Sequence, residues 1–152
     1  MSSVIYRQIQ PSEIATVSSL AREAFDQFVA PHYQTDGVTE FHSYASVEAL
    51  LQRHQSGYVT LVAEQSGRLV GMLHLREPDH VSMLFVQSSL QRTGIGRGLL
   101  AAAMAHTGDN HCAFTVNSSP NAVPAYERLG FRVTGSEQCL NGIRFVPMQR
   151  LG

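Results

Sequence analysis

Three glycines at alternate positions, Gly94, Gly96 and Gly98, follow an apolar run and open an alanine- and leucine-rich segment with the composition of a helix. The first N–H groups of a helix are unpaired and carry partial positive charge, which suits phosphate. Glycine lets the backbone approach an anion closely, and Arg92 and Arg97 can add charge-assisted hydrogen bonds. The pattern predicts a phosphate-binding loop, although a tightly packed strand-to-helix turn would also use glycines at this spacing.

Two common nucleotide-binding motifs do not fit this segment. The P-loop requires Gly-x-x-x-x-Gly-Lys-Ser/Thr, and the chain contains no lysine. The dinucleotide-binding fingerprint requires Gly-x-Gly-x-x-Gly near the start of a βαβ unit. Here the third glycine comes one residue too early, and a strand meander is expected before the loop.

A second informative stretch is residues 117–131, which read Asn-Ser-Ser-Pro-Asn-Ala-Val-Pro-Ala-Tyr-Glu-Arg-Leu-Gly-Phe. It resembles the later motif of the GNAT superfamily of N-acyltransferases, in which an Asn follows the fifth strand and a short helix carries a Tyr before a Leu-Gly-Phe turn. Residues 91–96, Gln-Arg-Thr-Gly-Ile-Gly, resemble the acyl-CoA pyrophosphate loop of that family, Gln/Arg-x-x-Gly-x-Gly/Ala. The two motifs occur in the family's order and at about its spacing.

The resemblance implies how acetyl-CoA would bind. The pantetheine arm would lie between the fourth and fifth strands and pair with fourth-strand backbone, and the pyrophosphate would lie on loop amides. The residues implied for the fourth strand are Leu84, Phe85 and Val86. Those implied for the loop and helix start are Gln91, Arg92, Thr93, Gly94, Ile95, Gly96, Arg97 and Gly98. Asn117 would bond the arm or order the end of the fifth strand, and Asn121 is either a helix cap or a cofactor contact.

Tyr126 is the implied catalytic acid, because the Tyr at this place in the family's motif points at the thioester sulfur. An ordinary Tyr pKa of about 10 exceeds a thiol pKa of about 8.5, so full proton transfer is uphill by about 2 kcal/mol, which is modest beside the whole barrier. The alternative is that Tyr126 only fills the contact between its helix and the sheet. The N–H of Val86 is the candidate oxyanion donor.

The general base is left open by the sequence. An alkyl amine is mostly protonated at neutral pH, so a proton must leave directly or through water. The candidates are Glu40, His74, Glu77 and His80, and a route through bulk water without a dedicated residue is equally compatible. The histidines show no metal-ligand spacing, so no metal is expected.

Five aromatic residues lie in the first two expected helices, which wall the acceptor site in this family. They are either an aromatic acceptor pocket or ordinary core, and they are Phe25, Phe28, Tyr33, Phe41 and Tyr44. At Ala125 the family often has a bulky aromatic residue, so the cleft is expected to be wider there.

Hydrophobic periodicity predicts an α/β (α+β) fold with one mixed sheet of about seven strands, helices on both faces, and the order β-α-α-β-β-β-α-β-α-β-β. The expected strands are residues 4–10, 58–65, 68–77, 80–86, 112–116, 131–137 and 144–149. The expected helices are residues 12–31, 39–54, 94–106 and 121–129, and the second is either continuous or broken near Ser46, which would cap its second half. The strands on either side of the third helix require a crossover and should be parallel neighbours.

Alternation and end signals add finer expectations. Two sets of residues should each share one face of their strand: Val81, Met83 and Phe85 in one, and Leu69, Gly71, Leu73 and Leu75 in the other. His74 should share a face with Val70 and Met72. Ser12 and Ser46 are the expected N-caps and Gly130 the expected C′ residue. Pro147 should place the last strand at a sheet edge or mark the end of that strand.

The bulk properties exclude several classes of protein. The 152 residues suit one domain, residues 1–152, and the net charge of −1 with a pI of about 6.6 argues against a nucleic-acid partner. No signal peptide or membrane-spanning run is evident, and Cys112 and Cys139 are expected to be buried thiols of a cytoplasmic protein.

The sequence thus favours an acetyl-CoA-dependent N-acetyltransferase acting on a primary amine of a small molecule, amino acid or peptide. The alternative is a non-catalytic acyl-CoA sensor or interaction module, because fold alone does not settle turnover. Homodimerisation is common in the family and is compatible with an apolar strand edge near Phe145.

Overall fold

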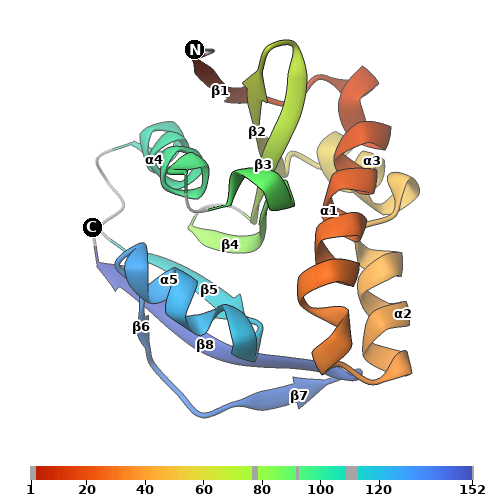
Figure 1. Cartoon of the computed structure of the whole chain (residues 1–152), viewed down its shortest axis with the longest axis vertical. Helices are drawn as coiled ribbons and strands as arrows, with labels where there is room; N and C mark the ends of the chain where they lie inside the picture. Colours follow the sequence, from red (N-terminus) through yellow and green to blue (C-terminus); the bar gives the residue numbers. More distant parts are fainter. Residues whose placement is uncertain (1–2, 77–78, 92, 109–112, 152) are drawn as a thin grey trace.

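The computed structural model describes residues 3–76, 79–91, 93–108 and 113–151, which form one mixed sheet with helices on both faces (Figure 1). The strands are β1 (Val4–Gln8), β2 (Val59–Gln65), β3 (Arg68–Arg76), β4 (His80–Val86), β5 (Ala113–Ser118), β6 (Arg132–Val133), β7 (Gln138–Leu140) and β8 (Ile143–Leu151). The α-helices are α1 (Ile14–Phe28), α2 (Thr35–Tyr44), α3 (Val47–Gln55), α4 (Ile95–Thr107) and α5 (Val123–Arg128).

The strand order across the sheet is β1-β2-β3-β4-β5-β8-β6, and β7 also pairs with β8. Of these pairs only β4 and β5 are parallel, and α4 connects them. The predicted mixed sheet and the predicted parallel crossover are therefore confirmed. There are eight strands instead of about seven because residues 131–140 form two short strands, β6 and β7, that pair with successive parts of β8.

Two apolar clusters cover the two faces of the sheet. One lies under α4 and α5 and includes Leu73, Leu99 and Phe114. The other lies under α1 to α3 and includes Val17 and Met72. Because both faces are buried, the central strands are apolar on both sides, as expected for a sheet between two helical layers.

The helix ends depart from the sequence expectations in two places. Ser46 caps α3, with its side chain accepting from the Ala49 N–H at 3.1 Å, as predicted. Ser12 is not a cap: a 3₁₀ turn (Pro11–Glu13) precedes α1, and Gln10 and Glu13 form its capping box. The second helix begins at Thr35, four residues before the expected start at residue 39.

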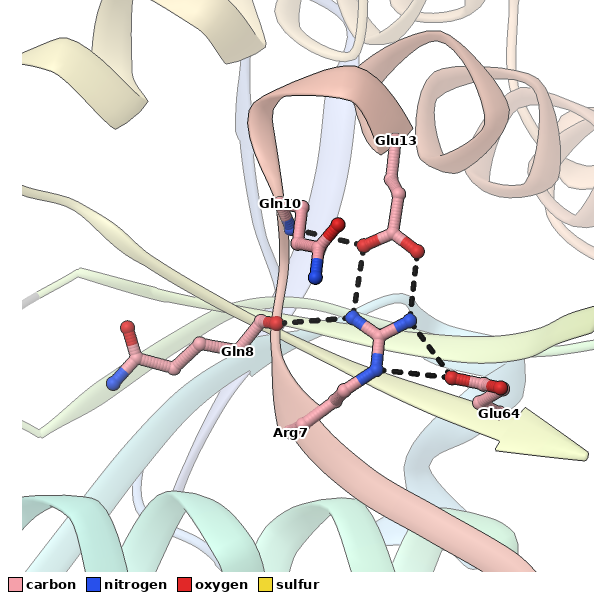
Figure 2. A network of polar contacts seen from close by, with 5 residues as sticks. All are labelled: Arg7, Gln8, Gln10, Glu13 and Glu64. Atoms are coloured by element: carbon pink, nitrogen blue, oxygen red, sulfur yellow. Dashed lines mark hydrogen bonds and ion pairs between the residues drawn. The ribbon is translucent and has the colours of Figure 1, made fainter. Parts of the chain in front are cut away.

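Glu13 also belongs to an ion-pair network that joins three elements (Figure 2). The Arg7 guanidinium, on β1, bonds Glu13 at 2.7 Å and Glu64 of β2 at 2.8 Å. The Arg7 bonds lower the pKa of Glu13 from 4.5 to about 2. The network fastens the start of α1 to the β1–β2 edge of the sheet.

Pro147 was expected at a sheet edge or at the end of its strand. Both alternatives were wrong, because β8 lies between β5 and β6 and Pro147 is in the middle of β8. Pro147 pairs with Asn117 on β5, and on its other side its carbonyl accepts from the Thr134 N–H at 2.9 Å. It lies opposite the interruption between β6 and β7, where the ladder needs no N–H from β8. A proline is therefore tolerated inside the sheet.

Three further findings concern the bulk properties. Cys139 is exposed on β7, so the expectation of a buried thiol was wrong there, while Cys112 lies outside the described residues. Among the described helices, none is both long and apolar enough to cross a membrane. The described side chains form no cluster of His, Cys, Asp and Glu suited to a metal ion.

Candidate active site

β4 pairs with β5 only through its first two residues, and the two strands then diverge. The paired positions are His80 with Thr115 and Val81 with Val116. On the other side of β4, Leu75 pairs with Val81 and His74 pairs with Met83, so Ser82 is an extra residue, a β-bulge. A bulge bends its strand and increases the twist, and this one lies where pairing with β5 stops.

The bulge also changes which side chains share a face. Val81 packs under α4, whereas Met83 and Phe85 pack on the α1–α3 side, so the expected common face was wrong. A second register shift, at Val70 in β3, puts Leu69 on the α1–α3 side and Val70 on the α4 side. Regular alternation predicts neither, because one extra residue inverts every later position.

The diverging end of β4 presents backbone groups on its open edge. The Gln87 N–H donates to the Val70 carbonyl on β3 at 2.8 Å. Because backbone groups alternate between the two edges of a strand, those of Val86 and Leu84 point toward β5. The Val86 carbonyl accordingly accepts from the Gln91 side chain at 3.3 Å rather than from β3. Of the three predicted fourth-strand residues, Phe85 has its backbone directed at β3.

The loop after β4 leads into the N-terminus of α4. A 3₁₀ turn (Ser88–Leu90) follows Gln87, and the Thr93 hydroxyl donates to the Leu90 carbonyl at 2.5 Å. Gly94 has φ of +93°, a conformation that favours glycine. The first bond of the helix runs from the Gly98 N–H to the Gly94 carbonyl at 3.0 Å. The N–H groups of residues 95–97 precede it and point out of the helix end.

The three glycines have different surroundings. A Cβ at Gly94 would meet no atom within 4 Å, and one at Gly96 would only touch a Val86 methyl at 4.0 Å. A Cβ at Gly98 would overlap the ring of Tyr6. Gly98 therefore lets β1 pack closely on α4, and its N–H is already bonded within the helix.

The remaining predicted loop residues also have distinct positions. The Ile95 side chain is buried against Gly71, so only its N–H faces the loop. The Arg97 guanidinium donates to the Arg128 carbonyl at the end of α5, at 3.1 Å. Arg92 lies outside the described residues. Residues 87–98 contain no acidic side chain, so the helix end and its open glycines suit an anion.

Tyr126 lies on α5, with its ring edge-to-face with Phe131 at 5.5 Å between centroids. Burial raises the pKa of Tyr126 above its ordinary value of 10. The Tyr126 side chain as a whole is half-buried. The Phe131 N–H bonds the Tyr126 carbonyl at 3.0 Å across Gly130, whose φ is +98°, so the predicted C′ residue is confirmed.

Two asparagines flank the link from β5 to α5. Asn117 is exposed on β5, just beyond the last pair with β4. Asn121 donates from Nδ2 to the Phe28 carbonyl, at the end of α1, at 2.7 Å. The N-cap of α5 is Ala122, so the cap interpretation of Asn121 was wrong. Its cofactor contact stays a prediction.

His74 is enclosed and fully hydrogen-bonded. It is 1% exposed, accepts at Nε2 from Arg53 at 3.0 Å, and bonds Thr60 through Nδ1 at 2.8 Å. Burial and the Arg53 charge lower the pKa of His74 from 6.5 to about 4. Because the Nε2 lone pair is occupied by a guanidinium, the geometry argues against His74 as a direct base.

The other base candidates lie in different places. His80 bonds Thr115 at 2.8 Å at the closed end of the β4–β5 pair, about 20 Å along the strand from Val86. Glu40 is exposed on α2, next to Phe41, and Glu77 lies outside the described residues.

The predicted aromatic residues form a row toward β4. Phe25 stacks on Phe41 at 4.0 Å, and Phe41 contacts Phe85 edge-to-face at 5.7 Å. Tyr33 contacts Phe25 edge-to-face at 5.6 Å. Phe25 is core, at 2% exposed, while the rings of Phe41, Phe85 and Tyr33 are half-buried.

The family follows from a match to a family model. The model of the acetyltransferase (GNAT) domain matches residues 29–151. The chain belongs to the GNAT acetyltransferase family. Its domain is therefore that of an acyltransferase, and acyl-CoA is the group donor of this family.

Solved structures agree with this assignment. A GCN5-related N-acetyltransferase of Rhodopseudomonas palustris is 26% identical, with a TM-score of 0.84 over 99% of this chain and 97% of that one. The PaiA N-acetyltransferase of Thermoplasma acidophilum, solved with coenzyme A, shares the fold at 21% identity and a TM-score of 0.82, over 99% of both chains. Among curated proteins, none matches the chain significantly.

Proposed function

We propose that this protein transfers an acetyl group from acetyl-CoA to a primary amine of a small molecule, amino acid or peptide, by direct attack in a ternary complex. The observation that carries the proposal is the continuity of two sets of backbone groups that are not used in the pairing of β4 with its neighbours or within α4. The open edge of β4 at Leu84 and Val86 leads within a few residues to the unpaired N–H groups of residues 95–97. An arm that ends in a pyrophosphate fits such an arrangement.

The residues present fit acetyl-CoA in each of its parts. Leu84 and Val86 would pair with the amides of the arm, and the N–H groups of residues 95–97 would hold the pyrophosphate over the open Cα of Gly96. Acetyl-CoA supplies the activated thioester. The Val86 N–H would stabilise the negative charge that develops on the carbonyl oxygen during attack.

Tyr126 would donate a hydrogen bond to the departing sulfur. Its raised pKa keeps it protonated at every working pH, so it can always donate. The same shift makes complete proton transfer to a thiolate more uphill than ordinary pKa values suggest. Tyr126 thus acts mainly by a hydrogen bond to the developing thiolate. A donor at the sulfur favours catalysis, because a purely sensory protein would not need one.

The amine would lose its proton to solvent. His74 is enclosed and His80 lies at the far end of β4. The remaining acceptors are exposed Glu40, water, and Glu77, which lies outside the described residues. We further propose that residues 1–152 form a single cytoplasmic domain; a homodimer is compatible with this function.

The first test is the thermal midpoint with acetyl-CoA. Binding at a hundredfold excess over Kd stabilises by about 2.7 kcal/mol, which in a chain of this size raises the midpoint by roughly 3–8 °C. NAD is the control nucleotide. No shift with any CoA ester would refute the proposed site.

The second test separates catalysis from sensing. Tyr126→Phe should keep the acetyl-CoA shift and lower kcat about 100-fold with the best substrate from an amine panel. An unchanged kcat would remove the acid role of Tyr126. Binding without turnover by the wild-type protein, over the whole panel, would favour the sensor.

A further inference from the structure

The connection between α1 and α2, residues 29–34, and the helix ends on either side of it bridge the two halves of the molecule at the open end of the β4–β5 divergence. On one side it continues from α1, which packs on β3 and β4. On the other side it contacts elements that lie beyond β5. In Figure 1 the ends of β7 and β8 meet the lower end of α2.

Side-chain hydrogen bonds fasten this connection in two places. Asn121, in the link from β5 to α5, donates to the Phe28 carbonyl at 2.7 Å. The Tyr33 hydroxyl donates to the Arg144 carbonyl on β8 at 2.5 Å, and the Arg144 guanidinium donates back to the His32 carbonyl at 3.2 Å. The bonds cross from the N-terminal half of the sheet to the C-terminal half.

A close backbone contact completes the attachment. A Cβ at Gly37 would overlap the Gly142 carbonyl, and one at Gly142 would overlap Asp36. Gly142, with φ of +80°, lies in the turn between β7 and β8. Glycine at both positions lets this turn pack closely against the start of α2, so the far end of the connection is also in contact with the C-terminal half of the sheet.

The α1–α2 connection also lies on the side from which an amine must approach. α4 and α5 cover the opposite face of the sheet, over the cluster that includes Leu84 and Val86. The face left for the acceptor is the α1–α3 side, toward which the half-buried ring of Phe85 points from β4. Movement of the connection would therefore change the acceptor site before it changed the acyl-CoA site.

We propose that Asn121 and Tyr33 are positioning residues, which hold the α1–α2 connection across the opening as a fixed wall of the amine-acceptor site. This inference rests on the proposed function for its acceptor. It differs from the family-based expectation for Asn121, because it assigns the amide to the acceptor wall rather than to the cofactor. Neither residue touches the reacting atoms in this scheme.

The test compares Asn121→Ala, Asn121→Asp and Tyr33→Phe with wild type. Asn121→Asp keeps the shape but cannot donate to a carbonyl at neutral pH, and Tyr33→Phe removes only the hydroxyl. Ser56→Ala is the matched control, because Ser56 also donates to a helix-end carbonyl, that of Gln52 at 3.0 Å, but on α3.

Amide hydrogen exchange measures the stability of the α1–α2 connection and does not require turnover. The N–H groups of His32, Tyr33 and Val38 are hydrogen-bonded within the connection and the first turn of α2. Each test variant should exchange these amides roughly fivefold faster than wild type, whereas Ser56→Ala should leave them unchanged. Unchanged exchange in all three test variants would overturn the proposal.

Steady-state kinetics then measure the effect on the amine-acceptor site. The KM for the best amine of the panel should rise about fivefold, while the Kd for CoA, measured by calorimetry, stays within about twofold. If Asn121→Ala raised the Kd for CoA as much as the KM for the amine, Asn121 would be a cofactor contact and the inference would be overturned. If wild type binds CoA but acetylates no amine, the proposed function fails, and unchanged CoA affinity with faster exchange still supports the positioning role.

Discussion

The burial of His74 predicts a specific loss of stability in weak acid. Its pKa is about 4 in the folded protein and 6.5 in the unfolded chain. Between these values the unfolded chain binds the proton and the folded protein does not, so stability is fully present above pH 6.5 and falls as the pH is lowered toward 4. At 1.36 kcal/mol per pH unit, this one group accounts for about 3 kcal/mol over the window.

The assay is urea unfolding at pH values from 7 to 4.5, on wild type and His74→Met. The variant should be less stable at pH 7, because Arg53 and Thr60 lose their partner. Its stability should nevertheless change by about 2–3 kcal/mol less than that of wild type across the window. His32→Gln, at an exposed histidine, is the control and should follow wild type.

If the free energy of unfolding depended on pH equally in wild type and His74→Met, the reasoning would be refuted, because only wild type contains the His74 imidazole that titrates. The same variant also tests catalysis. If His74→Met stayed folded and bound CoA but lost turnover, His74 would act in the reaction despite its enclosure. We expect instead that turnover follows the folded fraction, since neither ring nitrogen is available to an amine.

Four more predictions concern the site and the residues that support it. Gly96→Ala should leave the unfolding midpoint in urea nearly unchanged but weaken CoA binding about tenfold, since a methyl group would enter the open cradle. Gly98→Ala should lower the free energy of unfolding by about 1 kcal/mol, with the CoA affinity of the folded protein preserved. If instead Gly96→Ala lost stability and Gly98→Ala lost CoA affinity, Gly98 would be the glycine at the cofactor and Gly96 the packing glycine. Arg7 holds the pKa of Glu13 near 2, so this ion pair should add about 1 kcal/mol to the free energy of unfolding after solvent screening. That stabilisation should be lost as the pH falls from 4.5 toward 2, and it should be absent in Glu13→Gln. Glu40→Gln should leave the pH–rate profile unchanged if solvent takes the amine proton, whereas an altered acid limb would make Glu40 the base.

The sequence alone was sufficient for the fold class, for the family, and for placing the glycine-rich loop at the start of a helix. All three depend on local signals: alternation in the strands, the alanine- and leucine-rich helix after Gly94, and two motifs whose residues are neighbours in the chain. The parallel crossover followed as well, because a helix between two strands of one sheet leaves little other choice. The Ser46 cap was predictable for the same reason, since its hydrogen bond closes within four residues.

Tertiary structure decided which residues face which neighbour. The extra residue Ser82 inverts the later part of β4, and no local signal distinguishes a bulged serine from an ordinary one in a strand. Gly98 looked like the other two glycines until Tyr6, 92 positions earlier in the chain, was placed against it. His74 looked like a candidate base until Arg53 and Thr60 enclosed it.

Asn121, at the proposed acceptor wall, shows the same difference between what local sequence signals predict and what tertiary contacts decide. Its motif context implied a cap or a cofactor contact, while its partner is a carbonyl 93 residues away in the chain. Short-range patterns determine backbone conformation because the hydrogen bonds of helices, turns and caps close over a few residues. Burial, pKa and hydrogen-bond partners depend on contacts between distant segments, and only the folded chain brings those segments together.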